Sequence, residues 1–275
     1  MSETSSKHFG SIRDDYAFFL QHSTEAEADL RAYAPHLHGL AMGDESYRML
    51  DFGCGDGSFT AKFLVQSRWL PERLWLAIVE PDATYRQQAV DQLQAFTPHP
   101  VQAWPALPPH LNACFELILA NHVLYYVRDL KGTLSAILHA LATSGLFLAA
   151  MAGRANALAQ FSHRCFDILG KPFPFKTSED VEIALASLGE DYGAEEVHYE
   201  SVFPDTEEHR LSMGRFLMGS DFDAVPRRAI LEGFDPYSNA GKIAMQVVHK
   251  HFIVRRHMPR QGRHSAASPP KPRQH

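Results

Sequence analysis

The sequence contains little cysteine, and its cysteines are poorly placed for cross-links. Its 275 residues include Cys54, Cys114 and Cys165, which lie far apart and form no Cys-x-x-Cys pair. An odd number at this spacing is not the pattern of a disulfide framework or of a cysteine zinc site. We therefore expect a protein of a reducing compartment, the cytoplasm, with no bound metal.

Positive charge is also scarce. Lys and Arg number 26 against 32 Asp and Glu, so the formal net charge is −6. A grip on nucleic acid or on an anionic membrane needs basic surface, so neither is an expected partner. No apolar run reaches the ~18 residues that would suggest a membrane span. The polar start also lacks the apolar segment of a secretory signal.

The chain does have a hydrophobic fraction of 45%, enough for a full core, and no internal repeat. Its length suits one large domain, which we place at 11–258. Residues 1–10 are polar and expected to be flexible. The Pro-rich and basic segment 259–275 cannot bury a core and is expected to be disordered.

The middle of the domain alternates strand-like and helix-like segments. Apolar strand patterns fall at 49–51, 74–80, 115–120 and 146–151, with helical patterns at 58–66, 82–96 and 130–143. This alternation predicts βαβ units in an α/β fold with a parallel sheet. Outside it we expect helices at 14–33, at 177–188 and twice within 205–234, and strands at 195–203 and 246–254.

The most informative segment is 49–57, where an apolar strand runs into Asp51 and then has glycine at every second position. Glycine permits a sharp strand-to-helix turn and lets the backbone approach a ligand closely. A dinucleotide-binding turn has G-x-G-x-x-G, whereas this G-x-G-x-G spacing is typical of methyltransferases that use S-adenosylmethionine. That cofactor has no pyrophosphate but carries an ammonium and a sulfonium, which an acid at the strand end can help to hold. The loop residues assigned to the cofactor are Asp51, Gly53, Cys54, Gly55 and Gly57. A structural tight turn and a dehydrogenase site are the alternatives.

Two further strand ends carry polar residues. Glu80 and Pro81 follow the second strand, where a carboxylate usually grips a nucleotide ribose. Asn121 and His122 end the strand at 115–120, at the edge of the sheet where ligands of α/β folds bind. We assign Glu80, Pro81 and Asn121 to the cofactor and place His122 at its junction with the substrate.

Tyr125 and Tyr126 follow directly. An aromatic ring near a sulfonium attracts it by a cation–π interaction of ~0.5–2 kcal/mol. We expect at least one of the two to pack in the core instead.

Together these pieces resemble the class I methyltransferase family. The resemblance implies a Rossmann-like fold: a seven-stranded, mostly parallel sheet with helices on both faces. The N-terminal helix and the helices within 155–235 would then form a lid over the substrate pocket. Strings at 18–25, 79–81, 123–129 and 177–180 resemble, more narrowly, the histamine N-methyltransferase family. This likeness spans about 12–254.

That resemblance implies roles for particular residues. The acid of the His-Ser-Thr-Glu string, Glu25, would contact an amine substrate. The residues that would line the substrate pocket are Tyr16, Phe19, Phe161, Phe216, Tyr125 and Tyr126. The chain departs from the family at His122, where the family has glutamine, and at Val248, where it has asparagine. Both amides help to recognise histamine, so the acceptor here is not expected to be histamine itself.

We expect an in-line methyl transfer from S-adenosylmethionine to a small molecule, at a nitrogen of an amine or N-heterocycle. Holding the nucleophile in line is worth ~7–11 kcal/mol of the barrier. His122 is the candidate base if the acceptor must lose a proton, and Glu25 its catalytic partner. Methylation of an oxygen or carboxylate, a macromolecular substrate and a non-catalytic S-adenosylmethionine-binding protein are the alternatives. The protein is expected to be a monomer or a homodimer.

Overall fold

The computed structural model describes residues 12–37, 40 and 46–256, which form nine α-helices, several short 3-10 helices and eight strands. The strands are β1 (Tyr47–Phe52), β2 (Leu74–Val79), β3 (Gln102–Trp104), β4 (Phe115–Asn121), β5 (Leu141–Met151), β6 (Gly193–Pro204), β7 (Ser238–Asn239) and β8 (Lys242–Arg255). The α-helices are α1 (Arg13–Gln21), α2 (Glu25–Leu37), α3 (Ser58–Ser67), α4 (Ala83–Leu93), α5 (Leu130–Ala140), α6 (Ala157–Ile168), α7 (Ser178–Leu188), α8 (Glu207–Met218) and α9 (Arg227–Glu232). The predictions for 1–10 and 259–275 lie outside the described residues.

All eight strands belong to one sheet, ordered β3-β2-β1-β4-β5-β8-β6, with the two-residue β7 paired to β8. The first five strands of that order are parallel, and β8 is antiparallel to both of its neighbours. The predicted Rossmann-like, mostly parallel sheet is therefore confirmed. The strand order reverses between β1 and β4, which makes the carboxyl ends of these strands the expected place for a ligand.

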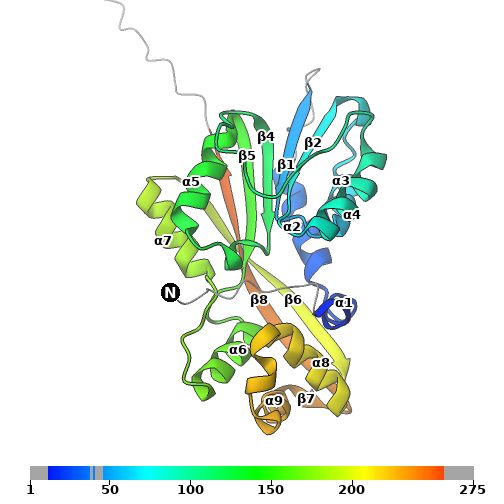
Figure 1. Ribbon diagram of the computed structural model, residues 1–275, viewed down its shortest axis with the longest axis vertical. Coiled ribbons are helices and arrows are strands. Elements are labelled where there is room, and N and C mark those ends of the chain that lie inside the picture. The colour runs from blue at the N-terminus through cyan, green and yellow to red at the C-terminus, as the bar shows by residue number, and fades with distance from the viewer. Residues whose placement is uncertain (1–11, 38–39, 41–45, 257–275) are drawn as a thin grey trace, which may run out of the picture.

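Helices cover both faces of this sheet (Figure 1). Side chains alternate along β4, so Ile118 and Ala120 pack with α5 and α7, whereas Leu117 and Leu119 pack with α2, α3 and α4. Both sets are buried. Burial on the two faces explains why the parallel strands read as nearly continuous apolar runs in the sequence.

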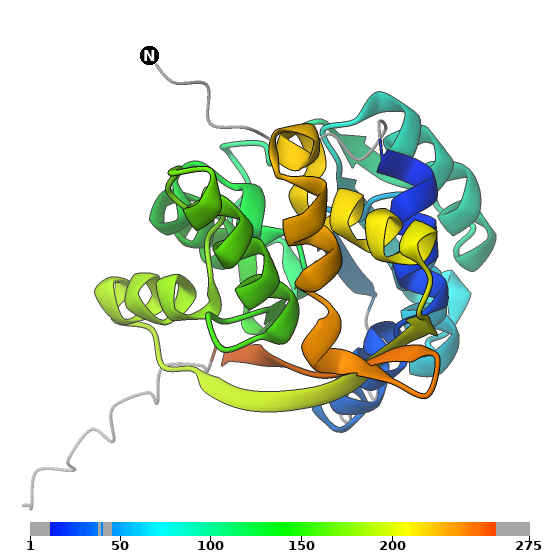
Figure 2. The same cartoon turned by 90° about the horizontal axis from the view of Figure 1, so that it is seen from below.

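A third apolar cluster lies beyond the carboxyl ends of the parallel strands. It joins α1, α6, α8 and α9 to the parts of β6 and β8 that extend past the main sheet, with Phe203, Met245 and Val247 buried among them. Figure 2, seen from below, shows the helices of 207–232 crossing this end of the molecule. These inserted helices, which we call the lid, lie beyond the edge of the sheet where a ligand is expected. That they cover a substrate stays a prediction.

The predicted helix at 14–33 is wrong in one respect, because it is two helices. Residues 22–24 leave the helical path and pair with β6: Val202 N–H donates to the carbonyl of His22 at 2.8 Å, and Thr24 N–H donates to that of Glu200 at 2.9 Å. A β-bridge joins Ser23 to Ser201. This pairing is long-range, and the local helical periodicity could not reveal it.

The other differences are the ends of some elements and two short strands. The helix predicted at 130–143 ends at Ala140, and β5 begins there because Leu141 already pairs with Phe115. The short strands β3 and β7 were not predicted.

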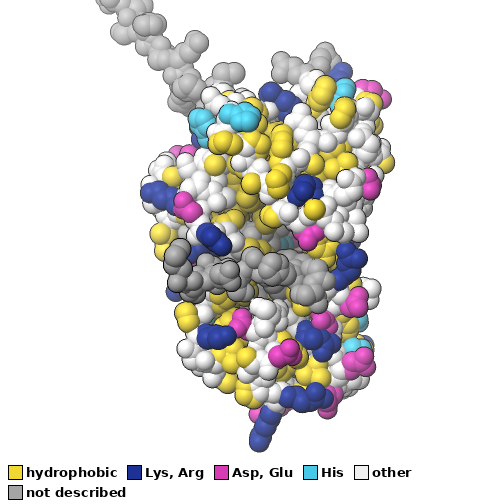
Figure 3. Space-filling view, in the orientation of Figure 1, with side chains coloured by type: hydrophobic (Ala, Val, Ile, Leu, Met, Phe, Trp, Pro, Cys, Tyr) yellow, Lys and Arg dark blue, Asp and Glu magenta, His cyan; other side chains and the backbone are white. Residues whose placement is uncertain are grey.

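Within the described residues, no helix combines the length and apolarity needed to cross a lipid bilayer. On the face shown in Figure 3, acidic and basic side chains are interspersed and form no broad patch of one sign.

Candidate functional site

The glycine loop connects β1 to α3 in the way the sequence predicts. Gly53 has φ +78° and Gly55 has φ +57°, both in the left-handed region that favours glycine. A Cβ on Gly53 would lie 2.0 Å from Cγ2 of Val123, whereas a Cβ on Gly55 would meet no atom within 4 Å. Packing therefore requires glycine at Gly53, and the loop is open to a ligand at Gly55.

An acid stands beside this loop at the end of each of two neighbouring strands. Glu80, just after β2, accepts hydrogen bonds from the N–H of Gly55 at 3.0 Å and of Asp82 at 2.9 Å. A carboxylate offers about four acceptor positions, so Glu80 keeps capacity for further donors. Asp51, in β1, is buried and accepts a hydrogen bond from the Thr60 hydroxyl. Burial raises the pKa of Asp51 to about 7 and also raises that of Glu80.

The other residues assigned to the cofactor, Cys54, Pro81 and Asn121, interact mainly with the protein itself. Burial strongly raises the pKa of the Cys54 thiol, so it stays protonated and is not a nucleophile. The Pro81 carbonyl accepts from the Arg86 guanidinium at 3.0 Å. The Asn121 amide donates to Asp29 at 3.0 Å and accepts from the Tyr33 hydroxyl at 2.8 Å. Asn121 therefore has its amide committed to protein partners.

A cavity of about 150 Å³ lies between the strand ends and the lid. A cavity of about this volume admits a molecule the size of benzene. Its lining includes seven of the residues predicted for the substrate, Tyr16, Phe19, Glu25, His122, Tyr125, Tyr126 and Phe216. Phe161 is not among them, because it is fully buried and stacks on Phe234 with ring centroids 4.5 Å apart.

The cavity walls are largely aromatic. Phe216 of α8 stacks on Phe19 with centroids 4.4 Å apart and on Tyr16 at 5.7 Å, both from α1. Across the cavity lining, Tyr126 meets Phe175 edge to face at 5.6 Å. Such walls bind a flat apolar or cationic group through burial and the ring quadrupoles.

A model of the methyltransferase domain family matches residues 16–189. The chain belongs to this methyltransferase family. Three solved structures share its fold. The YcgJ protein of Bacillus subtilis is 12% identical with a TM-score of 0.54, and the match covers 82% of this chain and 98% of that one. A putative methyltransferase of Bacillus halodurans is 12% identical with a TM-score of 0.54, covering 82% and 99%. A putative sarcosine dimethylglycine methyltransferase of Galdieria sulphuraria is 10% identical with a TM-score of 0.51, covering 84% of each chain. No curated protein shows significant sequence similarity.

Membership of this family makes S-adenosylmethionine the methyl donor. The glycine loop fits that molecule, because it is open at Gly55 and flanked by the carboxyl groups of Asp51 and Glu80. Glu80 has acceptor capacity for ribose hydroxyls, and an ionised Asp51 would complement the donor's positive charge.

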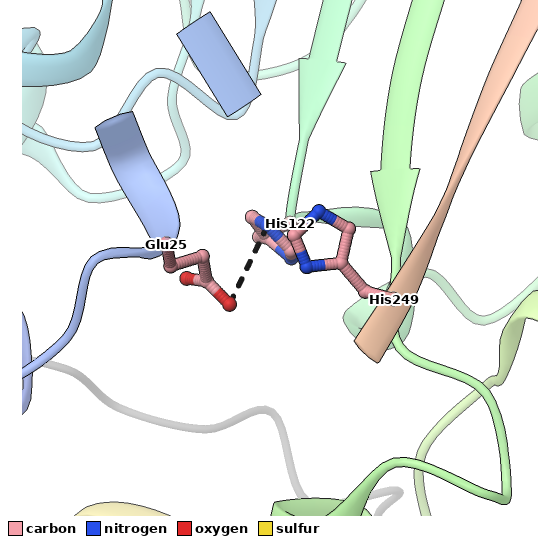
Figure 4. A group of neighbouring side chains, drawn as sticks. All are labelled: Glu25, His122 and His249. Carbon is pink, nitrogen blue, oxygen red and sulfur yellow. Dashed lines mark ion pairs between the residues drawn. The ribbon is translucent and has the colours of Figure 1, made fainter. Parts of the chain in front are cut away.

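Two charged side chains, Glu25 and His122, line one part of the methyltransferase's cavity, which we call its floor. Glu25 is the first residue of α2, and His122 follows β4 with φ +53°, a strained conformation for a residue with a side chain. Their side chains form an ion pair at 3.6 Å and are 16% and 18% exposed. Figure 4 shows them turned toward one another, with His249 beside them.

Behind this floor lies Asp29, a carboxylate with no exposed surface. Oδ1 accepts from Nε2 of His249 at 2.7 Å and of His251 at 2.8 Å. Oδ2 accepts from Nε2 of His122 at 3.1 Å and from the Asn121 amide. Burial alone would raise the pKa of Asp29, but the charge on His122 and the hydrogen bonds from the imidazoles hold it well below its usual value.

The two carboxylates fix the charge of His122. Burial alone would lower its pKa, but Glu25 and Asp29 raise it to about 9. The ring therefore carries a proton at neutral pH and, in that state, cannot act as the predicted base. Its Nδ1 lies 3.0 Å from the hydroxyl of Tyr125, which in turn accepts from the N–H of Ala152 at 2.6 Å.

Several residues of this site were not predicted. Asp29 lies one helical turn after Glu25, and His249 and His251 alternate along β8, so each spacing was a readable sign of a shared face. Tyr199, on β6, also lines the cavity, and burial and Glu25 together raise its pKa. Only the tertiary structure brings Asp29 to the two histidines.

Proposed function

We propose that this methyltransferase transfers a methyl group to a nitrogen of a small amine or N-heterocycle. The observation that carries the proposal is the half-buried Glu25 carboxylate at the floor of an aromatic cavity. A carboxylate removed from bulk water favours a cationic or N–H-donating partner, and aromatic walls favour the same cation. The resemblance of the Glu25 string to that of the histamine N-methyltransferase family supports this choice.

The size of the cavity limits the acceptor. Its volume of about 150 Å³ suits a single ring or a short chain, not a polymer segment. Because His122 and Val248 replace the family's two amides, the acceptor is a different nitrogen compound from histamine. The absence of nucleic-acid and membrane partners, the cytoplasmic setting and the monomeric or dimeric state remain expectations from composition.

The protein's part in the reaction is to bind and orient. When bound, S-adenosylmethionine supplies an electrophilic methyl group on a sulfonium. Glu25 holds the polar end of the acceptor, while Phe19 and Phe216 pack against its body and exclude water. Tyr125 and Tyr126 line the side of the cavity next to the strand end that carries His122. Only a neutral nitrogen has the lone pair that attacks, so an acceptor that binds as an ammonium first loses its proton to solvent. Orientation of the neutral nitrogen then supplies most of the rate enhancement.

The test is a radiolabel assay with S-adenosylmethionine carrying a labelled methyl group. The full chain is offered four ring compounds, benzylamine, 4-methylimidazole, phenol and benzoate. We expect label on the two nitrogen compounds and on neither oxygen compound. Label on phenol or benzoate alone would show that the acceptor atom is oxygen.

Two variants separate the halves of the site. Glu80→Ala should weaken S-adenosylmethionine binding, measured by calorimetry, while Glu25→Gln should leave it unchanged. Glu25→Gln should instead raise KM for the nitrogen acceptor about tenfold, the effect of losing one charge-assisted hydrogen bond. An unchanged KM removes Glu25 from the acceptor site.

A further inference from the structure

Three potential metal ligands meet at the floor of the cavity. They are the Glu25 carboxylate at the start of α2, the His122 imidazole after β4 and the His249 imidazole on β8, and one ligand atom of each lies within 4.8 Å of the others. Figure 4 shows the three side chains converging from three elements. Ligand atoms about 2.0–2.2 Å from one ion lie at most about 4.4 Å apart. The limit of 4.8 Å on the distances between these three atoms is a few tenths of an ångström above that value, so small side-chain shifts would bring them to ligand spacing.

One ring nitrogen of His249 has no hydrogen-bond partner in the part of the chain that the structure describes. Its ring is buried, and Nε2 donates to Oδ1 of Asp29 at 2.7 Å. Nδ1 then carries a lone pair, and it has no hydrogen-bond partner among the described residues. Buried polar atoms are nearly always paired, so an unpaired one calls for an ion or a water.

The hydrogen bond to Asp29 is also the one that a metal-binding histidine usually makes. Such a histidine donates its second ring N–H to a carboxylate, which fixes the tautomer and the orientation of the ring. Asp29 serves His249 in this way and is itself held by the Asn121 amide at 3.0 Å and by His251 at 2.8 Å. Asp29 and its partners therefore hold the His249 ring in the orientation that a ligand histidine needs.

His122 has matching support. Nε2 donates to Oδ2 of Asp29 at 3.1 Å and lies 3.6 Å from the Glu25 carboxylate, and Nδ1 lies 3.0 Å from the Tyr125 hydroxyl. A bound ion would take the place of the Nε2 proton and of its hydrogen bond to Asp29. Ligation through Nε2 leaves the Nδ1–H free to donate to that hydroxyl. The Nε2 proton is released to solvent when the ion binds, as a metal-bound imidazole requires.

A second group of ligands, Asp29, His249 and His251, is also close enough for an ion. Binding there through both Nε2 atoms would put a proton on each Nδ1. Neither Nδ1 has a partner among the described residues, so two N–H donors would be buried and unsatisfied. Each such donor costs ~1–3 kcal/mol. In the group of Glu25, His122 and His249, His249 would bind the ion through Nδ1 and keep its Nε2–H bonded to Asp29, so it would bury no unsatisfied N–H.

We propose that Glu25, His122 and His249 form a binding site for a divalent first-row transition-metal ion, open toward the acceptor cavity. Two imidazoles and one carboxylate suit zinc, cobalt or iron(II) better than magnesium or calcium, which prefer oxygen ligands. Glu25 and His122 line the cavity. On the proposed function, a cationic acceptor and the ion both require the Glu25 carboxylate, so the two bind in alternation.

The test is direct metal binding, with no methyl transfer involved. The full chain, free of a polyhistidine tag and treated with a chelator, is titrated with Zn²⁺ by calorimetry and with Co²⁺ by visible absorption. The diagnostic variant is His249→Gln, whose amide can keep the hydrogen bond to Asp29 but has no atom in place of Nδ1. The matched control is His198→Gln, the same substitution at an exposed histidine of the neighbouring strand β6.

We expect the wild type and His198→Gln to bind Zn²⁺ with the same Kd and His249→Gln to bind at least tenfold more weakly. The absorption of bound Co²⁺ should be lost in His249→Gln only. Equal binding by all three proteins, or no binding by any of them, overturns the proposal. If His249→Gln does not fold by circular dichroism, Glu25→Gln takes its place with the same expected weakening. Because no turnover is measured, an error in the proposed acceptor leaves this result intact.

Discussion

Replacing Asp51 with asparagine should stabilise the protein at alkaline pH. Asp51 is 3% exposed and accepts a hydrogen bond from the Thr60 hydroxyl. Burial raises its pKa from an ordinary 3.8 to about 7, with the hydrogen bond from Thr60 opposing the rise. The folded protein therefore carries the cost of a buried carboxylate whenever Asp51 is ionised.

The sign and size of the effect follow from this shift. In the folded state Asp51 keeps its proton up to pH about 7, whereas in the unfolded chain it loses the proton near 3.8. Between these pH values the folded state binds more protons, so the free energy of unfolding falls as pH rises and levels off above about 7. A difference of about three pKa units at ~1.4 kcal/mol each amounts to ~4 kcal/mol at pH 8. Asparagine has no proton to lose and removes this loss.

Urea unfolding followed by circular dichroism at pH 4.5 and pH 8 measures the effect. The stability of Asp51→Asn relative to the wild type should increase by ~3 kcal/mol between the two pH values. Asp91→Asn, at an exposed position of α4, is the control and should show no such increase. A relative stability of Asp51→Asn that stays constant or falls with pH would refute the reasoning. The same variant should bind S-adenosylmethionine about tenfold more weakly in calorimetry, since the donor's positive charge loses its partner.

The remaining predictions concern the loop, the cavity wall and the ion. Gly53→Ala should lower the free energy of unfolding by ~2–4 kcal/mol, because its Cβ overlaps a neighbouring side chain, whereas Gly55→Ala, which has open space, should cost only ~1–2 kcal/mol for its backbone; urea unfolding compares them. Phe216→Leu should raise the acceptor KM, whereas Phe161→Leu should lower the urea midpoint and leave KM unchanged, because only Phe216 lines the cavity. Zn²⁺ should inhibit methyl transfer in competition with the acceptor and not with S-adenosylmethionine, as initial rates at several concentrations of each will show.

The geometry of the glycine loop and of Glu80, which we assign to the cofactor, could be predicted from the sequence because it is local. Asp51, the glycine loop and Glu80 lie at strand ends within two consecutive βα units, so their spacing along the chain fixes their spacing in the fold. Four of the five parallel strands, β1, β2, β4 and β5, were equally readable, since both faces of the sheet are buried and these strands read as apolar runs.

The acceptor half was readable only in part. The resemblance located most of the cavity lining, including Tyr16, Glu25 and Phe216. It misled at Phe161, where the sequence marks an aromatic residue but not the direction of its ring. Asp29 and the two histidines of β8 were not predicted, because the hydrogen bond between His251 and Asp29 joins residues 222 positions apart and leaves no local pattern in the sequence.

The way the chain builds the two halves implies that they can change separately. Glu25 starts α2 where it does because residues 22–24 stop the preceding helix and pair with β6. His249 reaches the floor of the cavity because β8 enters the sheet antiparallel between β5 and β6. Neither β6 nor β8 carries a residue of the glycine loop or Glu80, which belong to the region of β1 and β2. Substitutions in the lid, β6 and β8 can therefore alter which acceptor binds and leave the glycine loop and Glu80 unchanged.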